Sequence, residues 1–385
     1  MNHLLYQFKK RRRPLVFVCL LMAGFGSNCM TQTPKLTNAF AASSGIAVDS
    51  KGNAFVTGQN NKVIKITAAG KAELFAGGGR NRKDGLAKEI RFSSLAGIAI
   101  DSSDNLYVAD GTRIRKITPE GFVTTIAGSE ISGYKDGDRS IATFVNLENI
   151  AIDNKGTIYV TDNEFTNNRG SSGHHVIRKI SAEGIVTTIK NGNEAELRVH
   201  YARGIACDKD GNLYVNASVS HCIKKISPSG VITTVAGQCD KTKFNSVYKE
   251  GPVSTAVLTN PSGMAIAKNG DIYITDTRLH RIIKIANNKV TTVAGSGKFN
   301  FSGNPAGAAE PGFADGKTTA ARFNAPAGIA FDRNGNLFIV DASSSNNSYI
   351  RKLSPEGMVT TFCKHEWNQA HYGKIPNPWP GNKNG

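Results

Sequence analysis

One five-residue phrase occurs six times along this chain of 385 residues, each time with alanine at its centre. The central alanines are Ala47, Ala99, Ala151, Ala206, Ala265 and Ala330. Successive copies start 52, 52, 55, 59 and 65 residues apart. A repeat of this length is typical of propellers and solenoids, in which each unit buries its apolar face only against its neighbours.

Each repeat contains four short apolar runs separated by polar turns. In the second repeat these runs are residues 97–100, 106–110, 114–117 and 123–128. They are rich in β-branched and aromatic residues, and no segment between the runs carries a 3.6-residue apolar period. The sequence therefore predicts an all-β fold, a six-bladed β-propeller of four-stranded antiparallel blades. The alternative, an open solenoid, would need end caps that we do not find in the sequence.

The repeats also resemble a known family. The second repeat reads Gly-Ile-Ala-Ile-Asp at 97–101, Asn-Leu-Tyr-Val-Ala-Asp at 105–110, Arg-Ile-Arg-Lys-Ile at 113–117 and Val-Thr-Thr-Ile-Ala-Gly at 123–128. These motifs in this order resemble the NHL repeat, over residues 43–363. The resemblance implies a propeller that serves as a platform for ligands or partners. Because NHL propellers share a fold and differ in role, it implies little about activity.

The first 28 residues are expected to form a signal peptide. A basic segment at 9–13 precedes an apolar stretch at 15–25, which is too short to span a membrane and suits a signal-peptide core. Cys29 follows small residues after this core, in a pattern that resembles a relaxed bacterial lipobox, so we expect Cys29 to carry a lipid. Free secretion after cleavage near Ala39-Phe-Ala41 and an uncleaved anchor are the alternatives.

We therefore expect a signal peptide at 1–28, a tether at 29–42, the NHL-type propeller at 43–365 and a C-terminal tail at 366–385. This order predicts secretion across the inner membrane. It also predicts a lipoprotein of the cell envelope, anchored to the outer membrane or held in the periplasm.

The chain is strongly basic, with a formal net charge of +17, of which five units lie at 9–13. One lysine recurs in the third run of every repeat, as Lys65, Lys116, Lys179, Lys225, Lys284 and Lys352. We interpret this column as a solvated strand face whose lysine stems cover apolar surface. The alternative is attraction to an anionic partner. We expect a monomer that contacts the membrane through its lipid, with a protein or an anionic glycan or lipid surface as partner and no nucleic acid.

Four cysteines remain beyond Cys29, and two of them are predicted to pair. Cys222 begins the third run of repeat four and Cys239 follows its fourth run. Antiparallel pairing of these runs about the turn at 228–230 brings both ends together, and an oxidising compartment permits a disulfide. Cys207 and Cys363 are expected to remain free thiols, and no cysteine spacing indicates a zinc site.

The best pocket candidate lies where the six-fold pattern breaks. The residue before the phrase is small in four repeats but is Glu148 in repeat three and Arg203 in repeat four. Asn149, His200 and Tyr201 stand beside them in the sequence. Inner strands of a propeller meet around a central channel, so these five residues are candidate ligand-binding residues. The alternative is that Glu148 and Arg203 form an ion pair across neighbouring blades.

Two further columns of polar residues are interpreted as structural. His175, His221 and His280 begin the third run in consecutive repeats, where blades are too far apart for the three to share a zinc ion. Asp110, Asp162, Asp276 and Asp341 end the second run. We expect these carboxylates to accept backbone hydrogen bonds from a loop or to pair with Arg113 and Arg281.

Two enzyme families resemble this architecture. The peptidylamidoglycolate lyases take zinc ligands from histidines before the phrase, a column that holds no histidine here. Gluconolactonase-like propellers hold one divalent metal with Glu, Asn and Asp, of which Glu148 supplies a single candidate. We therefore expect a non-catalytic binding or scaffolding module on the face of the inter-blade loops, with no cofactor, no metal site and no catalytic residue. The alternative is a metal-dependent hydrolase or lyase with its site at the channel mouth.

Overall fold

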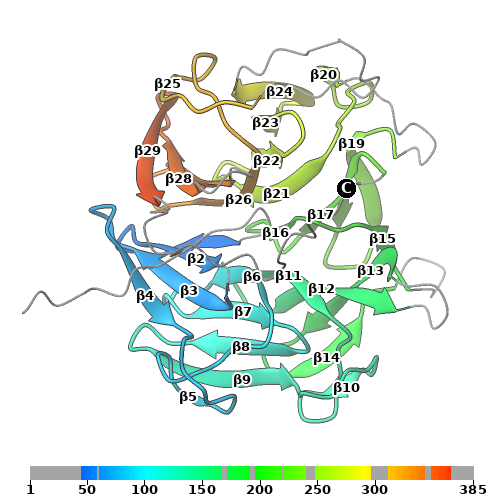
Figure 1. Cartoon of the computed structure of the whole chain (residues 1–385). Coiled ribbons are helices and arrows are strands. Elements are labelled where there is room, and N and C mark those ends of the chain that lie inside the picture. The colour runs from blue at the N-terminus through cyan, green and yellow to red at the C-terminus, as the bar shows by residue number, and fades with distance from the viewer. Residues whose placement is uncertain are drawn as a thin grey trace, which may run out of the picture. The chain divides into compact units, whose positions relative to one another are not determined.

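The computed structural model describes residues 45–58, 60–165, 171–190, 196–218, 220–239, 248–295, 311–342 and 348–365. These residues form six small antiparallel sheets arranged in a ring, which is the predicted six-bladed β-propeller (Figure 1). Cys29, the tether at 29–42 and the tail at 366–385 lie outside the described residues. No helix within the described ranges has the length and apolarity needed to cross a membrane.

Every blade has four strands, and the earliest in sequence lies innermost. Blade one contains β1 (Ile46–Val48), β2 (Ala54–Gly58), β3 (Lys62–Ile66) and β4 (Ala72–Ala76). Blade two contains β6 (Leu95–Ile100), β7 (Leu106–Asp110), β8 (Arg113–Ile117) and β9 (Phe122–Gly128). Blade three contains β11 (Leu147–Ile152), β12 (Ile158–Phe165), β13 (Ser171–Ile180) and β14 (Ile185–Thr188).

The remaining three blades repeat this plan. Blade four contains β16 (Ile205–Cys207), β17 (Leu213–Ala217), β18 (Cys222–Ile226) and β19 (Ile232–Gly237). Blade five contains β21 (Pro261–Ile266), β22 (Ile272–Asp276), β23 (Arg281–Ala286) and β24 (Lys289–Ala294). Blade six contains β26 (Pro326–Phe331), β27 (Leu337–Ala342), β28 (Ser348–Leu353) and β29 (Met358–His365).

The segments that lead into some blades add short strands at the edges. Two-residue strands pair with the outermost strand of blades two, three, five and six: β5 (Gly85–Leu86), β10 (Gly137–Asp138), β20 (Gly251–Pro252) and β25 (Gly316–Lys317). Covering an outer edge in this way removes unpaired backbone groups that would otherwise be free to pair with another chain. In blade three, β15 (Arg198–His200) also pairs with β13.

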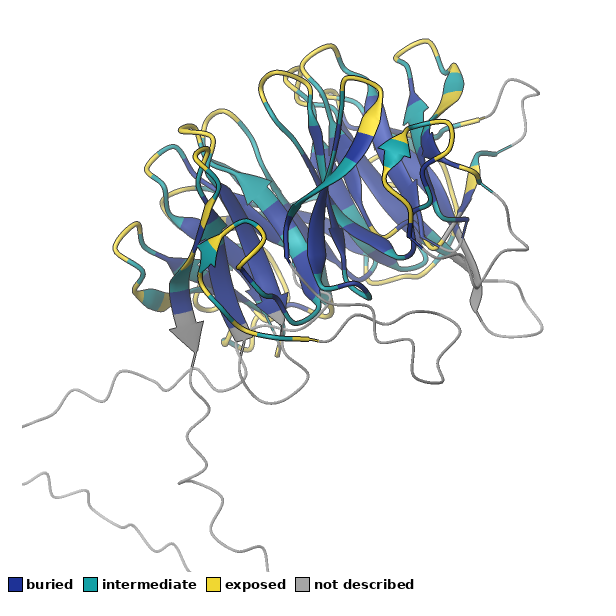
Figure 2. Ribbon diagram, turned by 90° about the horizontal axis from the view of Figure 1, so that it is seen from above, coloured by how far each residue is buried: buried dark blue, intermediate teal, exposed yellow. Residues whose placement is uncertain are grey.

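The apolar core lies between the blades, with exposed residues concentrated at the turns (Figure 2). Each cluster of buried side chains joins two neighbouring blades. Val48 and Val56 of blade one pack with Phe338 and Val340 of blade six. Blades one and six each contain their own four strands, so the ring closes by this packing and not by a strand exchanged between the ends of the propeller.

The glycine of the repeated phrase is required by the close approach of the next inner strand. A Cβ atom on Gly97 would lie 2.8 Å from Cα of Asn149, and one on Gly45 would lie 2.9 Å from the backbone nitrogen of Ile98. Side chains on the second strand reinforce this contact. Thr57 Oγ1 accepts from the Gly45 N–H at 2.9 Å and donates to the Ala96 carbonyl at 2.5 Å.

In blades two, three and six, a buried arginine on the third strand connects an aspartate of the second strand with an aspartate of the loop that leads into the blade. Arg178 is fully buried and donates to Asp162 at 3.1 Å and to Asp136 at 2.8 Å. Its guanidinium carbon lies 4.9 Å from the ring centres of both Tyr134 and Phe144. The equivalent residues in blades two and six are Arg115 and Arg351.

The aspartate column is structural, as expected, since Asp110, Asp162 and Asp341 each accept a backbone hydrogen bond from the loop that leads into their blade. Arg113 does pair with Asp110 at 3.2 Å. The recurring partner, however, is the arginine two positions further along the strand, which in blade two is Arg115. The alternation of the sequence places this arginine on the blade face that is covered by the neighbouring loop, and that is why it is buried.

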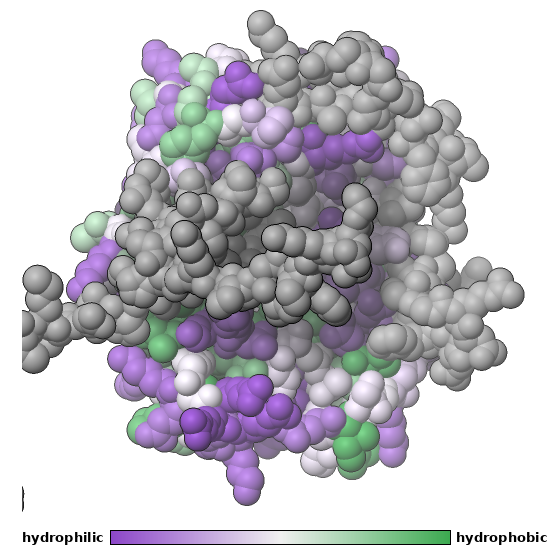
Figure 3. Space-filling model, in the orientation of Figure 1, coloured by the Kyte–Doolittle hydropathy of each residue, from purple (hydrophilic) through white to green (hydrophobic). Residues whose placement is uncertain are grey.

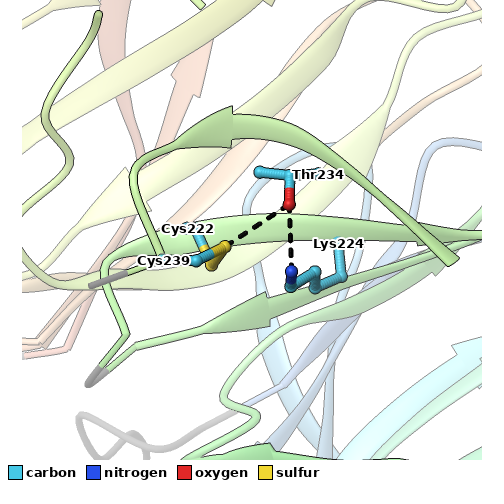
Figure 4. The surroundings of a disulfide bond; sticks show 4 residues. All are labelled: Cys222, Lys224, Thr234 and Cys239. Carbon is cyan, nitrogen blue, oxygen red and sulfur yellow. Dashed lines mark hydrogen bonds between the residues drawn. A yellow bond between two sulfur atoms is a disulfide. The ribbon is translucent and has the colours of Figure 1, made fainter. Parts of the chain in front are cut away.

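The structure joins Cys222 and Cys239, the pair that the sequence predicts, in a disulfide with a Cα–Cα distance of 5.0 Å (Figure 4). Thr234 lies beside it, with Oγ1 3.5 Å from Cys239 Sγ, and accepts a hydrogen bond from Lys224 Nζ at 2.9 Å. Cys207 and Cys363 are free thiols, and burial is the main cause that raises the pKa of each.

Replacing Arg178 by alanine should destabilise the propeller strongly. The substitution leaves the carboxylate of Asp162 buried without its cation, and breaking a buried pair in this way costs about 3–5 kcal/mol. Urea unfolding followed by tryptophan or tyrosine fluorescence measures the loss. The control is Lys179→Ala at the next position, which should change the free energy of unfolding by less than about 0.5 kcal/mol. Equal effects of the two substitutions would contradict the role given to Arg178.

Removing the disulfide should also lower stability. The two cysteines are 17 residues apart, and closing a loop of about this length contributes about 3 kcal/mol through the unfolded chain. Cys239→Ala should therefore lower the urea midpoint and make it insensitive to dithiothreitol, while the midpoint of the unmodified chain should fall when the reductant is added. A dithiothreitol effect that persists in Cys239→Ala would contradict the assignment.

Candidate functional site

A cavity of about 610 Å³ opens where the six inner strands begin. Every blade contributes to its wall. The second residue of each repeated phrase lines the cavity and is isoleucine or methionine: Ile46, Ile98, Ile150, Ile205, Met264 and Ile329. Glu148, Asn149, Tyr201 and Arg203 also line it. Four of the five candidate residues therefore meet at one cavity. The fifth, His200, ends β15, and its side chain lies outside the described part of the structure.

Glu148 is held in place by two side chains of its own blade. Its Oε2 lies 2.9 Å from Nε2 of His175, and its Oε1 accepts a hydrogen bond from Asn163 Nδ2 at 3.4 Å. His175 is buried, and its Nδ1 accepts a hydrogen bond from the Ala202 N–H at 3.3 Å. Because Nδ1 is an acceptor, a neutral His175 carries its proton on Nε2, the nitrogen that faces Glu148.

The environment of Glu148 favours its ionised form. Burial is the largest influence and by itself would raise the pKa of Glu148, but contact with His175, the charge of Arg203 and the Asn163 amide together hold that pKa below its usual value. The side chain is 35% exposed. Glu148 therefore presents a negative charge to the cavity at neutral pH.

Arg203 and Tyr201 are exposed at the wall of the same cavity. Tyr201 has a φ of 46°, in the left-handed region that non-glycine residues rarely adopt. Its ring meets the ring of His175 edge to face, with 6.4 Å between centres. The chain turns sharply here after β15, and this turn brings Tyr201 and Arg203 beside the Glu148 pair.

Asn149 occupies the position that glycine holds in the other five phrases. Its Nδ2 donates to the Ala202 carbonyl of the next blade at 3.0 Å, and its N–H donates to Thr161 Oγ1 at 2.9 Å. The side chain thus extends across the blade boundary toward the residues that carry Tyr201 and Arg203. It fixes the third blade against the fourth at the cavity.

The ion pair proposed as an alternative for Glu148 and Arg203 does not form among the described residues. Glu148 is paired with His175 instead, and Arg203 makes no ion pair within the same part of the chain. Sequence reasoning did not include His175 and Asn163 among the site residues. The available signal was in the sequence of blade three, which combines an acidic residue directly before the repeated phrase with a histidine at the start of its third strand.

The histidine column binds neighbouring blades. Besides the contact of His175 with Ala202, His221 Nδ1 lies 2.5 Å from the Thr259 carbonyl and His280 Nδ1 accepts from the Ala325 N–H at 2.8 Å. Each histidine thus joins its blade to the start of the next. In the described ranges, no three His, Cys, Asp or Glu side chains lie close enough together to hold a metal ion.

Hydrophobic residues on the face seen in Figure 3 are scattered in small groups among hydrophilic ones. Extended apolar patches are the usual sign of a protein-binding surface. The described residues visible on this face thus form no extended apolar patch.

Comparison with known proteins agrees with this architecture. The NHL repeat model matches residues 258–285. The chain is 27% identical over 307 residues to Protein SUPPRESSOR OF QUENCHING 1, chloroplastic, of Arabidopsis thaliana, an alignment that covers 73% of this chain and 27% of that protein. It is 29% identical over 119 residues to peptidyl-glycine alpha-amidating monooxygenase B of Xenopus laevis, covering 31% of this chain and 11% of that protein. This chain thus spans only a minor part of either relative.

Among solved structures, an auxiliary nutrient binding protein from Bacteroides ovatus superposes with a TM-score of 0.58 at 17% identity, covering 84% of this chain and 70% of that one. At this identity the likeness concerns the fold alone. The chain therefore forms a six-bladed β-propeller, and residues 258–285 of its fifth blade match the NHL repeat.

Proposed function

We propose that this chain is a non-catalytic binding protein whose small ligand enters the cavity at the face of the inter-blade loops. The observation that carries the proposal is the meeting of Glu148, Asn149, Tyr201 and Arg203 at one cavity, whose exposed lining is polar and apolar in about equal parts. Small-molecule sites are typically cavities of about 300–1,000 Å³ that combine mostly apolar walls with a few placed polar groups. The volume of about 610 Å³ falls within that range.

The state of Glu148 supports binding over catalysis. A general acid or base works best with a pKa near the working pH, and enzymes raise the pKa of a glutamate to reach it. Here the pKa of Glu148 is shifted the opposite way, because His175, Arg203 and Asn163 outweigh the effect of burial. A permanently ionised carboxylate suits electrostatic recognition of a ligand.

We further propose that the protein acts at the cell envelope after secretion, tethered through a lipid on Cys29. The basic and apolar segments at 9–25 and the position of Cys29 after them support this setting. The similar Bacteroides ovatus protein is named as an auxiliary nutrient binding protein, and by analogy we propose a nutrient as the class of ligand. We also propose that a partner protein or an anionic glycan or lipid surface contacts the lysine column of the third strands.

A substitution that fills the cavity mouth should abolish ligand binding without unfolding the chain. Ser94 is exposed and lines the cavity, so Ser94→Trp places a large side chain in the mouth. The probe is a panel of free amino acids, monosaccharides, disaccharides and dicarboxylic acids. We expect at least one compound to raise the melting temperature of the unmodified chain, since a ligand at a hundred times its Kd adds about 2.7 kcal/mol.

The matched control for this experiment is Ser102→Trp, which places the same side chain in the exposed turn at the far end of β6. The control should retain the melting shift that Ser94→Trp loses. A panel without any active compound, or a shift that survives in Ser94→Trp, would refute binding in the cavity.

Metal analysis distinguishes the proposed binding protein from the alternative, a metal-dependent hydrolase or lyase. We expect the purified chain to contain no stoichiometric divalent ion and its melting temperature to be unchanged by a chelator. A bound ion whose removal lowers the melting temperature, with loss of the ion in Glu148→Gln, would favour the enzyme instead.

A further inference from the structure

We propose that the ligand of this cavity is a zwitterion with an apolar body, namely a free amino acid or a short peptide with an aliphatic side chain. The inference rests on the proposed function and specifies its ligand. The geometry behind it is the placement of one carboxylate and one guanidinium, not bonded to each other, at the wall of the same small cavity.

Glu148 has acceptor capacity left for a cation. A carboxylate offers about four lone-pair sites, and the structure shows contacts to two side chains, His175 and Asn163. Both contacts hold the carboxylate in one orientation, with its side chain 35% exposed at the cavity. A ligand ammonium group can approach the remaining lone pairs without displacing either partner.

Arg203 offers the complementary group. A guanidinium has five N–H donors in a fixed fork that matches a carboxylate, and paired N–H···O bonds of this kind are among the stronger hydrogen bonds in proteins. Arg203 is exposed at the cavity and makes no ion pair within the described ranges. Its donors are therefore available to a ligand carboxylate.

The two charges together select against singly charged ligands. An anion drawn to Arg203 would also face the negative Glu148, and a cation drawn to Glu148 would face Arg203. A ligand that carries both charges pairs each of them, so no charge is left unpaired when the ligand excludes water from the cavity. A neutral sugar carries no charge to pair with either group.

The wall accounts for the apolar part of the ligand. Five isoleucines and one methionine, one residue from each blade, line the cavity at its boundary with the buried core between the blades. Burying one aliphatic side chain contributes about 1.5–3 kcal/mol. The arrangement favours a ligand with its charged head at the boundary of blades three and four and its aliphatic side chain against this wall.

The test is calorimetric titration of the full-length chain with L-leucine and two analogues that each lack one charge. Isoamylamine lacks the carboxylate, and 4-methylpentanoate lacks the ammonium group. We expect L-leucine to bind at least tenfold more tightly than either analogue. The dipeptide Leu-Leu distinguishes a site for short peptides from a site for the free amino acid, according to which of the two binds more tightly. Glucose represents neutral sugars and should not bind.

Two variants assign the charges to residues. In Arg203→Gln, L-leucine should bind no more tightly than isoamylamine, because the contact to the carboxylate is gone. In Glu148→Gln, L-leucine should bind no more tightly than 4-methylpentanoate. Arg198→Gln and Glu196→Gln are the matched controls, since both residues lie in the same region and neither lines the cavity. Both controls should bind L-leucine as the unmodified chain does.

The outcomes separate this inference from the proposed function. If isoamylamine or 4-methylpentanoate binds as tightly as L-leucine, or if a sugar binds and Ser94→Trp abolishes that binding, the zwitterion is wrong while binding in the cavity stands. If no compound of either panel binds, both proposals fail. The comparison among ligands needs no variant, so it remains decisive even where Glu148→Gln does not fold.

Discussion

Adjacent inner strands approach each other so closely that a single Cβ atom at the first position of the phrase would meet the backbone of the next blade. This contact sets the geometry of the ring, because six blades can surround a narrow channel only if their inner strands meet along their backbones. The surrounding polar bonds extend the same junction. Thr57 bonds the carbonyl of Ala96, and His280 accepts the N–H of Ala325, in each case from one blade to the next. The buried arginines act within one blade, where each connects the second strand to the loop that leads into the blade.

The candidate site lies where the contact between adjacent inner strands departs from the glycine pattern. Between blades three and four, Asn149 replaces glycine and bonds across the boundary through its side chain. The same blade has a longer third strand, β13, which is extended by pairing with β15. That pairing is what places Tyr201 and Arg203 next to Glu148 and buries His175 behind it. A local change in how two blades meet thus produces both the charge and the asymmetry of the cavity.

The fold and the position of the site follow from the sequence because both depend on a regular repeat and a visible departure from it. The repeated phrase predicts the blades, antiparallel register predicts the Cys222–Cys239 disulfide, and the rim column points to Glu148 and Arg203. What escapes sequence reasoning depends on loops. Arg178 is buried because an aromatic-containing loop folds over it, and a sequence pattern does not reveal where a loop will lie. His175 meets Glu148 for a similar reason, since both depend on how blade three meets the segment that follows it.

A ring of equivalent blades presents equivalent residues to its channel, so a ligand that lacks six-fold symmetry is recognised only by residues that break the pattern. The residue directly before the repeated phrase is small in four of the six repeats. The other two carry opposite charges that sit on adjacent blades without bonding to each other. If the pair served only the fold, the two charges would satisfy each other, as Arg178 and Asp162 do in the blade interior. Their separation at the wall of a cavity is instead the arrangement expected when a third group, carrying both charges, completes the site.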